Sequence, residues 1–373
     1  MQSEEELKYQ IAVTMLPHIG LRNVKALIEY FGSAHDVFLA TRQDLESIPN
    51  IRPNVVSSLV EQREKVLSRA DKELDFIFSH HLSTFYYKDE NYPYRLRECP
   101  DAPVLLYTKG NIRPNQGHFL AVVGTRVPTE RGKEKCRKMI LEMASATKNL
   151  TIVSGLAYGI DITAHRAAIE VGLPTFIIPG HGLDRIYPAV HRNTAIDALQ
   201  NGGILTEYMS GTNPDRQNFV ARNRIIAGLS DATLVVESKE KGGALLTAEM
   251  ANSYDRDVFA VPGRIDDICS RGCNALIKQN KAMLVENGHD ILQTMQWETA
   301  KSPASLQTKL FTDLSDEENS LLSLLHESAE GLHINLLVME TKMPYSKVAS
   351  LLLQMEFRGI VKSLPGGIYR ALE

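Results

Sequence analysis

Several features typical of secreted, membrane and metal-binding proteins are absent from this sequence. Four cysteines are too few for a disulfide framework in a chain of 373 residues, and Cys269 and Cys273 have no companion Cys/His pair to complete a zinc site. No apolar run is long enough to span a bilayer, and the acidic start MQSEEELKYQ is unlike a signal or transit peptide. We therefore expect a cytoplasmic protein with no bound metal and no membrane contact.

The common catalytic and nucleotide-binding motifs are missing as well. The sequence has no G-x-S-x-G elbow and no H-E-x-x-H helix, and Lys241-Gly242-Gly243 lacks the glycine–lysine order of a Walker A loop. The dinucleotide fingerprint G-x-G-x-x-G is absent too. Nothing assembles a nucleophile, a base and an orienting group, so we expect no enzymatic activity and no cofactor.

What the sequence does contain is a strand, a tight turn and a helix over FLAVVGTRVPTERG, residues 119–132. A buried strand at Phe119–Val123 is followed by Gly124, Thr125 and Arg126, and a helix begins near Pro128. Nucleotide-binding α/β domains open in this way, with phosphate at the helix N-terminus. Here an arginine replaces the glycine that a pyrophosphate would need. A guanidinium beside backbone N–H groups suits a phosphodiester, so the turn predicts a site for a polyanion rather than for NAD.

Residues 82–297 alternate between strand-like and helix-like segments. Short β-branched runs alternating with helices predict a doubly wound, mostly parallel sheet of the Rossmann-like α/β class, with ligands beyond the C-terminal ends of the strands. Helices are expected at Lys133–Ala146, Ile160–Val171 and Ala244–Tyr254. The expected strands are Ser83–Tyr87, Val104–Tyr107, Phe119–Val123, Leu150–Val153, Thr175–Ile178, Gly203–Thr206, Thr233–Val236, Val258–Val261 and Met283–Val285.

The two ends of the chain differ from this middle part, because both are net acidic while the middle is net basic. Residues 1–80 carry two similar turns, Leu16–Gly20 and Ile48–Arg52, each followed by an apolar helical run. This pattern resembles a helix-hairpin-helix (SAM-like) domain, a module that offers N–H groups to a DNA backbone. The second turn has Arg52-Pro53 in place of the hairpin glycine, and the segment is acidic. A structural or partner-docking module is therefore favoured.

The C-terminal part is predicted to be a winged helix at residues 313–373, joined by a polar linker at 298–312 to an α/β domain at 81–297. Three helical segments precede a hairpin in this part, and the last of the three offers only Lys347 and Arg358 as cations. That is little for a major-groove reader, so a protein partner is at least as well supported as duplex DNA. The expected elements are helices at Asp316–His326, Ile334–Met339 and Ser346–Arg358, and strands at Ile360–Ser363 and Ile368–Ala371.

Four glycine-containing turns follow expected strands and should meet at one edge of the sheet. They are Gly124–Arg126, Ser154–Asp161, Pro179–Asp184 and Lys241–Gly243. The glycines of the second turn permit positive φ and close backbone approach, and the fourth leads into a helix as a candidate anion nest.

The segment Arg216–Ala227 adds a nucleic-acid signal, because three arginines surround Phe219. Arginine neutralises phosphates, and an aromatic ring that stacks on an unpaired base contributes about 1–3 kcal/mol. Arg222 or Arg224 could instead be a buried partner of Asp161 or Glu237, and we expect at least one of the two to be structural.

These residues together resemble the DprA/Smf family, the DNA-processing protein A of bacterial transformation. The resemblance covers about residues 85–290 in order and is carried by VVGTR, SGLAYGID, GLDRIYP, FVARNRIIAGLS, VVES, GALLTA, FAVPG and SRGCNALI. It implies an extended Rossmann core between a helical N-terminal domain and a winged helix. It also implies a non-enzymatic protein that binds and protects incoming single-stranded DNA, forms a homodimer through the core and helps to load RecA recombinase.

The resemblance also assigns site residues. The family's glycine–serine–arginine phosphate motif falls on Gly124, Thr125 and Arg126, and its basic residue three positions before a base-contacting aromatic falls on Arg216 and Phe219. Its serine-containing turn appears here as Lys241–Gly243, which loses hydroxyl donors and gains a cation. The full expected single-stranded DNA site is Gly124, Thr125, Arg126, Ser154, Gly155, Arg216, Phe219, Arg222, Arg224, Lys241, Gly242 and Gly243.

Two other functions stay open at the level of sequence. A Rossmann-like nucleotide-binding enzyme, of the type that hydrolyses nucleotide glycosidic bonds, would need a carboxylate over the pocket, and Glu207 and Glu237 are the candidates. Asp161 and His165, one helical turn apart, more often indicate a capping aspartate and a hydrogen-bonded histidine than an acid/base pair. A scaffold that docks partners through its acidic ends is the third hypothesis.

Overall fold

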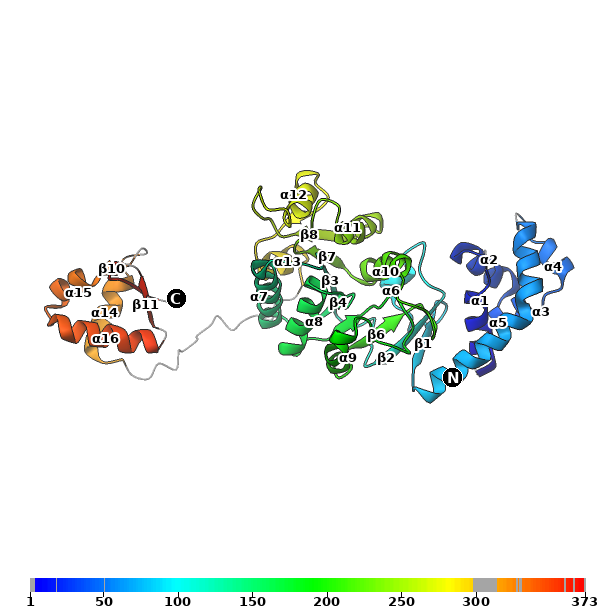
Figure 1. Cartoon of the computed structure of the whole chain (residues 1–373), viewed down its shortest axis with the longest axis horizontal. Coiled ribbons are helices and arrows are strands. Elements are labelled where there is room, and N and C mark those ends of the chain that lie inside the picture. Colours follow the sequence, from blue (N-terminus) through cyan, green and yellow to red (C-terminus); the bar gives the residue numbers. More distant parts are fainter. Residues whose placement is uncertain are drawn as a thin grey trace. The chain divides into compact units, whose positions relative to one another are not determined.

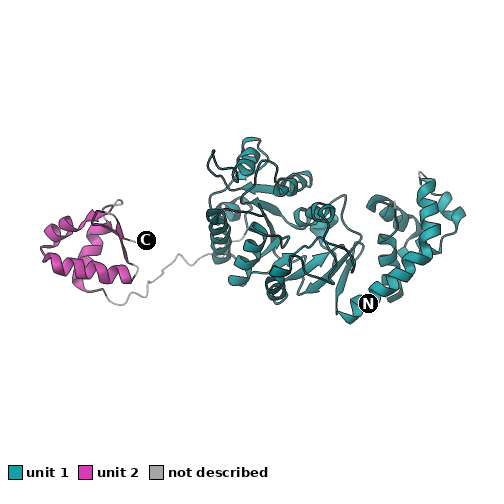
Figure 2. Ribbon diagram, viewed as in Figure 1, with its two compact units in different colours: residues 1–301 teal, residues 302–373 magenta. Residues whose placement is uncertain are grey.

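The computed structural model divides into two compact units, residues 1–301 and 302–373 (Figures 1 and 2). The expected linker at 298–312 lies outside the described residues. Among the residues described, no helix combines the length and the apolar character needed to cross a membrane. The structure describes residues 4–17, 19–49, 51–297, 314–326, 328, 331–358, 360–364 and 366–371.

Five helices precede the sheet of the first unit. The fourth begins with a reciprocal capping box between Thr41 and Asp44, and the fifth has Pro53 in its first turn, where a missing N–H costs nothing. Their apolar faces share one core, which continues onto Leu105 and Tyr107 of the sheet. The helix-hairpin-helix interpretation of this region stays a prediction. The helices are α1 (Glu4–Thr14), α2 (Leu21–Phe31), α3 (Ala34–Leu39), α4 (Arg42–Glu46) and α5 (Pro53–Ser79).

A nine-stranded sheet forms the centre of the first unit, and every strand expected within residues 82–297 is present in it. The order is β1-β2-β6-β5-β4-β3-β7-β8-β9, so the chain builds outward from β3 on one side and then crosses to the other side at β7. The β1–β2 and β2–β6 pairs are antiparallel and the others parallel. The strands are β1 (Ser83–Tyr86), β2 (Leu105–Gly110), β3 (His118–Val123), β4 (Leu150–Ser154), β5 (Thr175–Ile177), β6 (Gly203–Thr206), β7 (Ala232–Val235), β8 (Asp257–Ala260) and β9 (Met283–Leu284).

Helices cover both faces of this sheet, which explains why β3 is apolar at successive positions. Phe119 and Ala121 contribute to a core shared with α6, α10 and α11, while Leu120 and Val122 face a second core shared with α7, α8 and α13. The helices are α6 (Tyr94–Arg97), α7 (Glu130–Ala146), α8 (Ile160–Glu170), α9 (Arg192–Ala198), α10 (Arg216–Leu229), α11 (Gly243–Ser253), α12 (Arg271–Lys278) and α13 (Gly288–Thr294).

The second unit is a winged helix with a small three-stranded antiparallel sheet of order β10-β12-β11. The two cations expected on its last helix are paired inside the unit, Lys347 with Glu317, and Arg358, just after the helix, with Glu318. The two-residue strand β10 was not expected from the sequence. The elements are α14 (Asp316–His326), β10 (Leu332–His333), α15 (Ile334–Thr341), α16 (Tyr345–Phe357), β11 (Val361–Leu364) and β12 (Ile368–Ala371).

Candidate nucleic-acid interface

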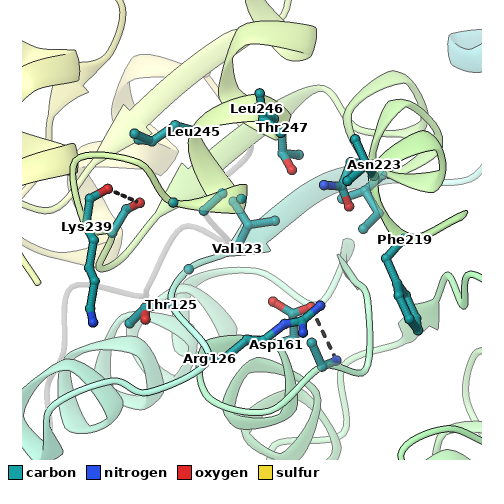
Figure 3. Close-up of a pocket in the computed structure, with 18 of the residues that line it drawn as sticks. Val123, Thr125, Arg126, Asp161, Phe219, Asn223, Lys239, Leu245, Leu246 and Thr247 are labelled. Atoms are coloured by element: carbon teal, nitrogen blue, oxygen red, sulfur yellow. Dashed lines mark hydrogen bonds between the residues drawn. The ribbon is translucent and has the colours of Figure 1, made fainter. Parts of the chain in front are cut away.

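A pocket of about 730 Å³ lies at the C-terminal ends of β3 and β7, where the strand order of the sheet reverses (Figure 3). This is where open α/β sheets bind their ligands. The walls come from the turn after β3, the start of α8, one side of α10, the turn after β7 and the first turns of α11. Lining residues include Gly124, Thr125, Arg126, Asp161, Arg216, Phe219, Arg222, Asn223, Lys239, Lys241, Gly242, Gly243, Leu246 and Thr247.

The turn after β3 is fixed by its neighbours. The Thr125 amide donates to the Glu237 carbonyl at 2.8 Å, and the Thr125 carbonyl accepts from the Ile160 amide at 3.2 Å. Gly124 is required for space, because a Cβ there would overlap the Ile160 side chain. Arg126 is exposed at the tip of this turn. The pocket therefore presents a guanidinium on a backbone that is already held in place.

The N-terminus of α7, where the strand–turn–helix pattern predicts phosphate, has a carboxylate of the protein beside it. The Glu237 carboxylate accepts from the Thr129 amide at 2.9 Å and from the Thr129 hydroxyl at 2.6 Å. A Cβ on Gly132 would overlap this carboxylate. Glu237 thus occupies the position of an anion at this helix end. It follows β7, which lies beside β3 only because the chain crosses over, so the local sequence gives no sign of it.

Neither carboxylate of the hydrolase interpretation lines the pocket. Glu237 is held against Thr129, and Glu207 is paired with Arg224, which also donates to the Asp101 carbonyl at 2.7 Å. Burial raises the pKa of Glu207, and Arg224 opposes that change. Arg224 is therefore one of the structural arginines foreseen for α10, although its partner is Glu207 rather than Glu237.

Arg222 is also largely structural. Its side chain is buried and its guanidinium donates to the Ile178 carbonyl at the end of β5. Burial lowers its pKa to about 10, and the negative charge of Asp161 opposes this change. Burial likewise raises the pKa of Asp161, with Arg222 opposing. The predicted relation between an α10 arginine and Asp161 is thus found at Arg222 as an attraction between opposite charges.

Gly155, in the turn after β4, has a different role from the one expected. A Cβ on Gly155 would overlap the Arg222 guanidinium, and its backbone does not adopt positive φ. The positive φ angles of this turn are at Leu156, 62°, and Gly159, 83°. The expectation that Gly155 provides a left-handed conformation is therefore wrong, since the residue is small to make room for an arginine 67 positions later.

Phe219 is partly exposed and is positioned by three neighbours. A Cβ on Gly180, in the turn after β5, would lie 2.8 Å from the Phe219 ring. The Arg126 guanidinium lies over the ring at 5.8 Å from its centroid, and the Tyr187 ring lies 5.8 Å away on a tilted plane. In Figure 3 the Arg126 side chain extends toward the Phe219 ring, which projects from α10. A cationic group and an aromatic face therefore meet at one point of the pocket.

The turn after β7 completes the rim. Lys239 and Lys241 are exposed on it, and the Ser238 hydroxyl donates to the Lys239 carbonyl at 3.0 Å. A Cβ on Gly242 would overlap the Ser238 hydroxyl, whereas Gly243 has open space around it. Glu240 and Glu249 also line the pocket, so its rim carries both signs of charge, with exposed cations on the turns and at Arg216.

The structure brings together most of the residues expected in the site, but not all. Ser154 is fully buried, and its hydroxyl donates to the Val122 carbonyl at 2.6 Å. Ser154, Gly155 and Arg224 do not line the pocket. Sequence reasoning missed several of the lining polar residues, among them Lys239, Asn223 and Thr247. Helical spacing could have found two of these, because Asn223 follows Phe219, and Thr247 follows Gly243, by one helical turn.

Comparisons with known proteins identify the family of this chain. Residues 83–296 match the family model of DNA recombination-mediator protein A, and residues 301–367 match that of the DprA winged helix domain. Protein Smf of Synechocystis is 30% identical over 402 residues, covering 99% of each chain. DNA processing protein DprA of Streptococcus pneumoniae is 41% identical over 214 residues, covering 57% of this chain and 74% of that protein.

Two solved structures are similar as well. That of DprA from Streptococcus pneumoniae has a TM-score of 0.66 at 35% identity and covers 77% of this chain and 97% of that one. The other, of DprA from Helicobacter pylori, is described by its single-stranded DNA binding mode. It has a TM-score of 0.53 at 30% identity and covers 58% of this chain and 97% of that one. The chain therefore belongs to the DprA/Smf family.

Proposed function

We propose that the pocket at the β3/β7 crossover binds single-stranded DNA, and that the protein acts in the cytoplasm as a non-enzymatic recombination mediator. The observation that carries the proposal is the meeting of exposed Arg126 with the partly exposed Phe219 ring, 5.8 Å from guanidinium to ring centroid. A phosphate on the guanidinium would leave the attached base within reach of the ring. Phosphate contact and base stacking are the two terms that hold single strands without sequence preference.

The combination of cations with an exposed aromatic ring supports a single strand rather than a duplex as the ligand. In a duplex the base faces are stacked on one another and unavailable, so an aromatic side chain beside a phosphate contact is useful only for unpaired bases. The exposed cations Arg216, Lys239 and Lys241 can contact further phosphates along a flexible strand. The Helicobacter pylori relative, whose structure concerns single-stranded DNA binding, supports the same choice of ligand.

The wider role rests on the family. We propose that this protein protects incoming DNA during transformation, forms a homodimer and helps to load RecA recombinase. We propose no catalytic step, because the carboxylates of Glu207 and Glu237 bind Arg224 and Thr129 and do not line the pocket. The internal pairing of Lys347 and Arg358 favours a protein partner over duplex DNA for the winged helix. The assigned domains, 1–80, 81–297 and 313–373, belong to the same proposal.

The proposal is tested by fluorescence anisotropy of a labelled oligo-dT, with unlabelled duplex of equal length as competitor. Arg126→Ala should weaken binding and lower the slope of log K against log salt by about 0.7, since one phosphate contact is lost. Arg113→Ala is the matched control, because Arg113 is exposed but lies outside this pocket. Competition by duplex as strong as by single strand, or equal losses in the two variants, would contradict the proposal.

A further inference from the structure

A second exposed aromatic residue stands next to Phe219. Tyr187 lies on the loop after β5, between half-buried Ile186 and buried Pro188, and 47% of its surface is exposed. Its ring centroid is 5.8 Å from that of Phe219, with an angle of 33° between the ring planes. The Arg126 guanidinium, the Phe219 ring and the Tyr187 ring are thus successive neighbours.

The loop that carries Tyr187 is held in place by hydrogen bonds at several points. The Asp184 carboxylate accepts from the Gly211 amide at 3.0 Å, and Arg185 donates to the Asn213 side chain at 2.9 Å. The buried His181 carbonyl accepts from the Thr206 hydroxyl at 3.1 Å. Tyr187 is therefore an exposed ring on a fixed support, which is the arrangement that a stacking surface requires.

Resting on the single-stranded DNA function proposed above, we propose that Tyr187 is a second base-stacking position. The strand would contact Arg126 with a phosphate, place one base on Phe219 and the neighbouring base on Tyr187. It would then leave the pocket over the C-terminal end of β5, rather than over β8. The ligand at Tyr187 is an unpaired nucleobase of any sequence, because every base has a face that can stack.

The spacing of the two rings favours a strand that is pulled open. Successive bases in a duplex strand rise by about 3.4 Å. The ring centroids are 5.8 Å apart, so bases on the two rings are separated by more than the stacked distance. Duplex cannot adopt this spacing without unstacking, and the pair of rings would therefore add to the preference for single strands.

The side chains on the opposite side of the pocket explain the choice of direction. The loop between β8 and α12 exposes the aliphatic residues Ile265 and Ile268 and offers no exposed aromatic ring. The loop after β5 exposes Tyr187 and is followed by exposed Arg192 at the start of α9, which adds positive charge along the proposed path. Aromatic faces and cations together occur on the β5 side.

The test compares Tyr187→Ala, Tyr187→Phe and the control Tyr30→Ala in the anisotropy assay with oligo-dT. Tyr30 is similarly exposed, 53%, but lies on α2 in the N-terminal helices. Tyr187→Ala should weaken binding by about 5-fold to 150-fold, the range expected for one stacked base. The salt slope should stay unchanged, because no phosphate contact is lost. Tyr187→Phe should bind nearly as well as the wild type, and Tyr30→Ala should have no effect.

A walk of single abasic sites along a short oligo-dT separates direct stacking from an indirect effect through Phe219. In the wild type, two adjacent positions should be sensitive to loss of the base. Tyr187→Ala should remove the sensitivity at one position and Phe219→Ala at the other. If Tyr187→Ala removes both sensitivities, or neither, the second stacking position is refuted while the proposed function stands. If the wild type does not bind oligo-dT at all, the proposed function itself fails and this inference fails with it.

Discussion

The carboxylate at the start of α7 gives a prediction that separates a structural glutamate from a catalytic one. Glu237 accepts two hydrogen bonds from Thr129, at 2.9 and 2.6 Å, and only 8% of the residue is exposed. Hydrogen bonds to a charged group contribute about 1.5–3 kcal/mol each, and loss of a helix cap costs about 0.5–2 kcal/mol. The Thr129 hydroxyl also accepts from the Gly132 amide at 3.0 Å, and this bond can remain when the Glu237 carboxylate is removed, which limits the loss of stability.

We therefore expect Glu237→Ala to destabilise the first unit by about 2–4 kcal/mol, which lowers the melting temperature of a unit of this size by roughly 3–6 °C. Glu237→Gln should lose about 1 kcal/mol or less, because its amide oxygen can accept from the Thr129 amide and its NH₂ group can donate to the Thr129 hydroxyl. Thermal unfolding followed by circular dichroism measures both.

The oligo-dT affinity of Glu237→Gln should equal that of the wild type at a temperature where both are folded. A stable Gln variant that no longer binds, or an Ala variant as stable as the wild type, would refute the capping role and return Glu237 to the list of ligand-contacting candidates.

Two further predictions concern the buried groups behind the pocket. Gly155→Ala should lower the free energy of unfolding by about 1–3 kcal/mol, because the new methyl group overlaps the Arg222 guanidinium. Gly243→Ala has nothing within 4 Å of the added atom and should unfold at the wild-type temperature. Equal melting temperatures for the two variants would contradict this prediction. Burial lowers the pKa of His165 to about 3 from its ordinary 6.5, so the unfolded chain takes up a proton that the folded protein does not. The free energy of unfolding should accordingly fall as the pH drops from about 6.5 toward 3, by up to roughly 1.4 kcal/mol per pH unit. Urea midpoints measured across this pH range should fall less steeply for His165→Gln than for the wild type.

The parts of the fold that could be predicted from the sequence are those set by local pattern. Every strand of the large sheet was expected because buried parallel strands are short, continuous β-branched runs between turn residues. Strand β10 was missed because two residues carry no period, and its partner β12 lies 35 positions further along the chain. The order of the strands, with β7 beside β3, was not accessible from any local pattern.

The residues of the candidate site also divide into features that local sequence predicts and features that depend on tertiary structure. Arg126 and Phe219 could be singled out by residue type, because a guanidinium in a turn and an aromatic among arginines are unusual on their own. The contact between them depends on tertiary structure that brings together residues 93 positions apart. Gly155 and Glu237 were misread for the same reason, since the groups that explain them, Arg222 and Thr129, are distant in sequence.

The buried Arg222 has a consequence for the kinetics of ligand capture. From α10 it contacts Gly155 after β4 and the Ile178 carbonyl after β5, with Asp161 of α8 supplying opposite charge. One side chain thus links the loops of neighbouring strands before any ligand arrives. A site assembled in advance loses little entropy on complex formation, so the association rate should be limited by encounter and charge rather than by rearrangement of these loops.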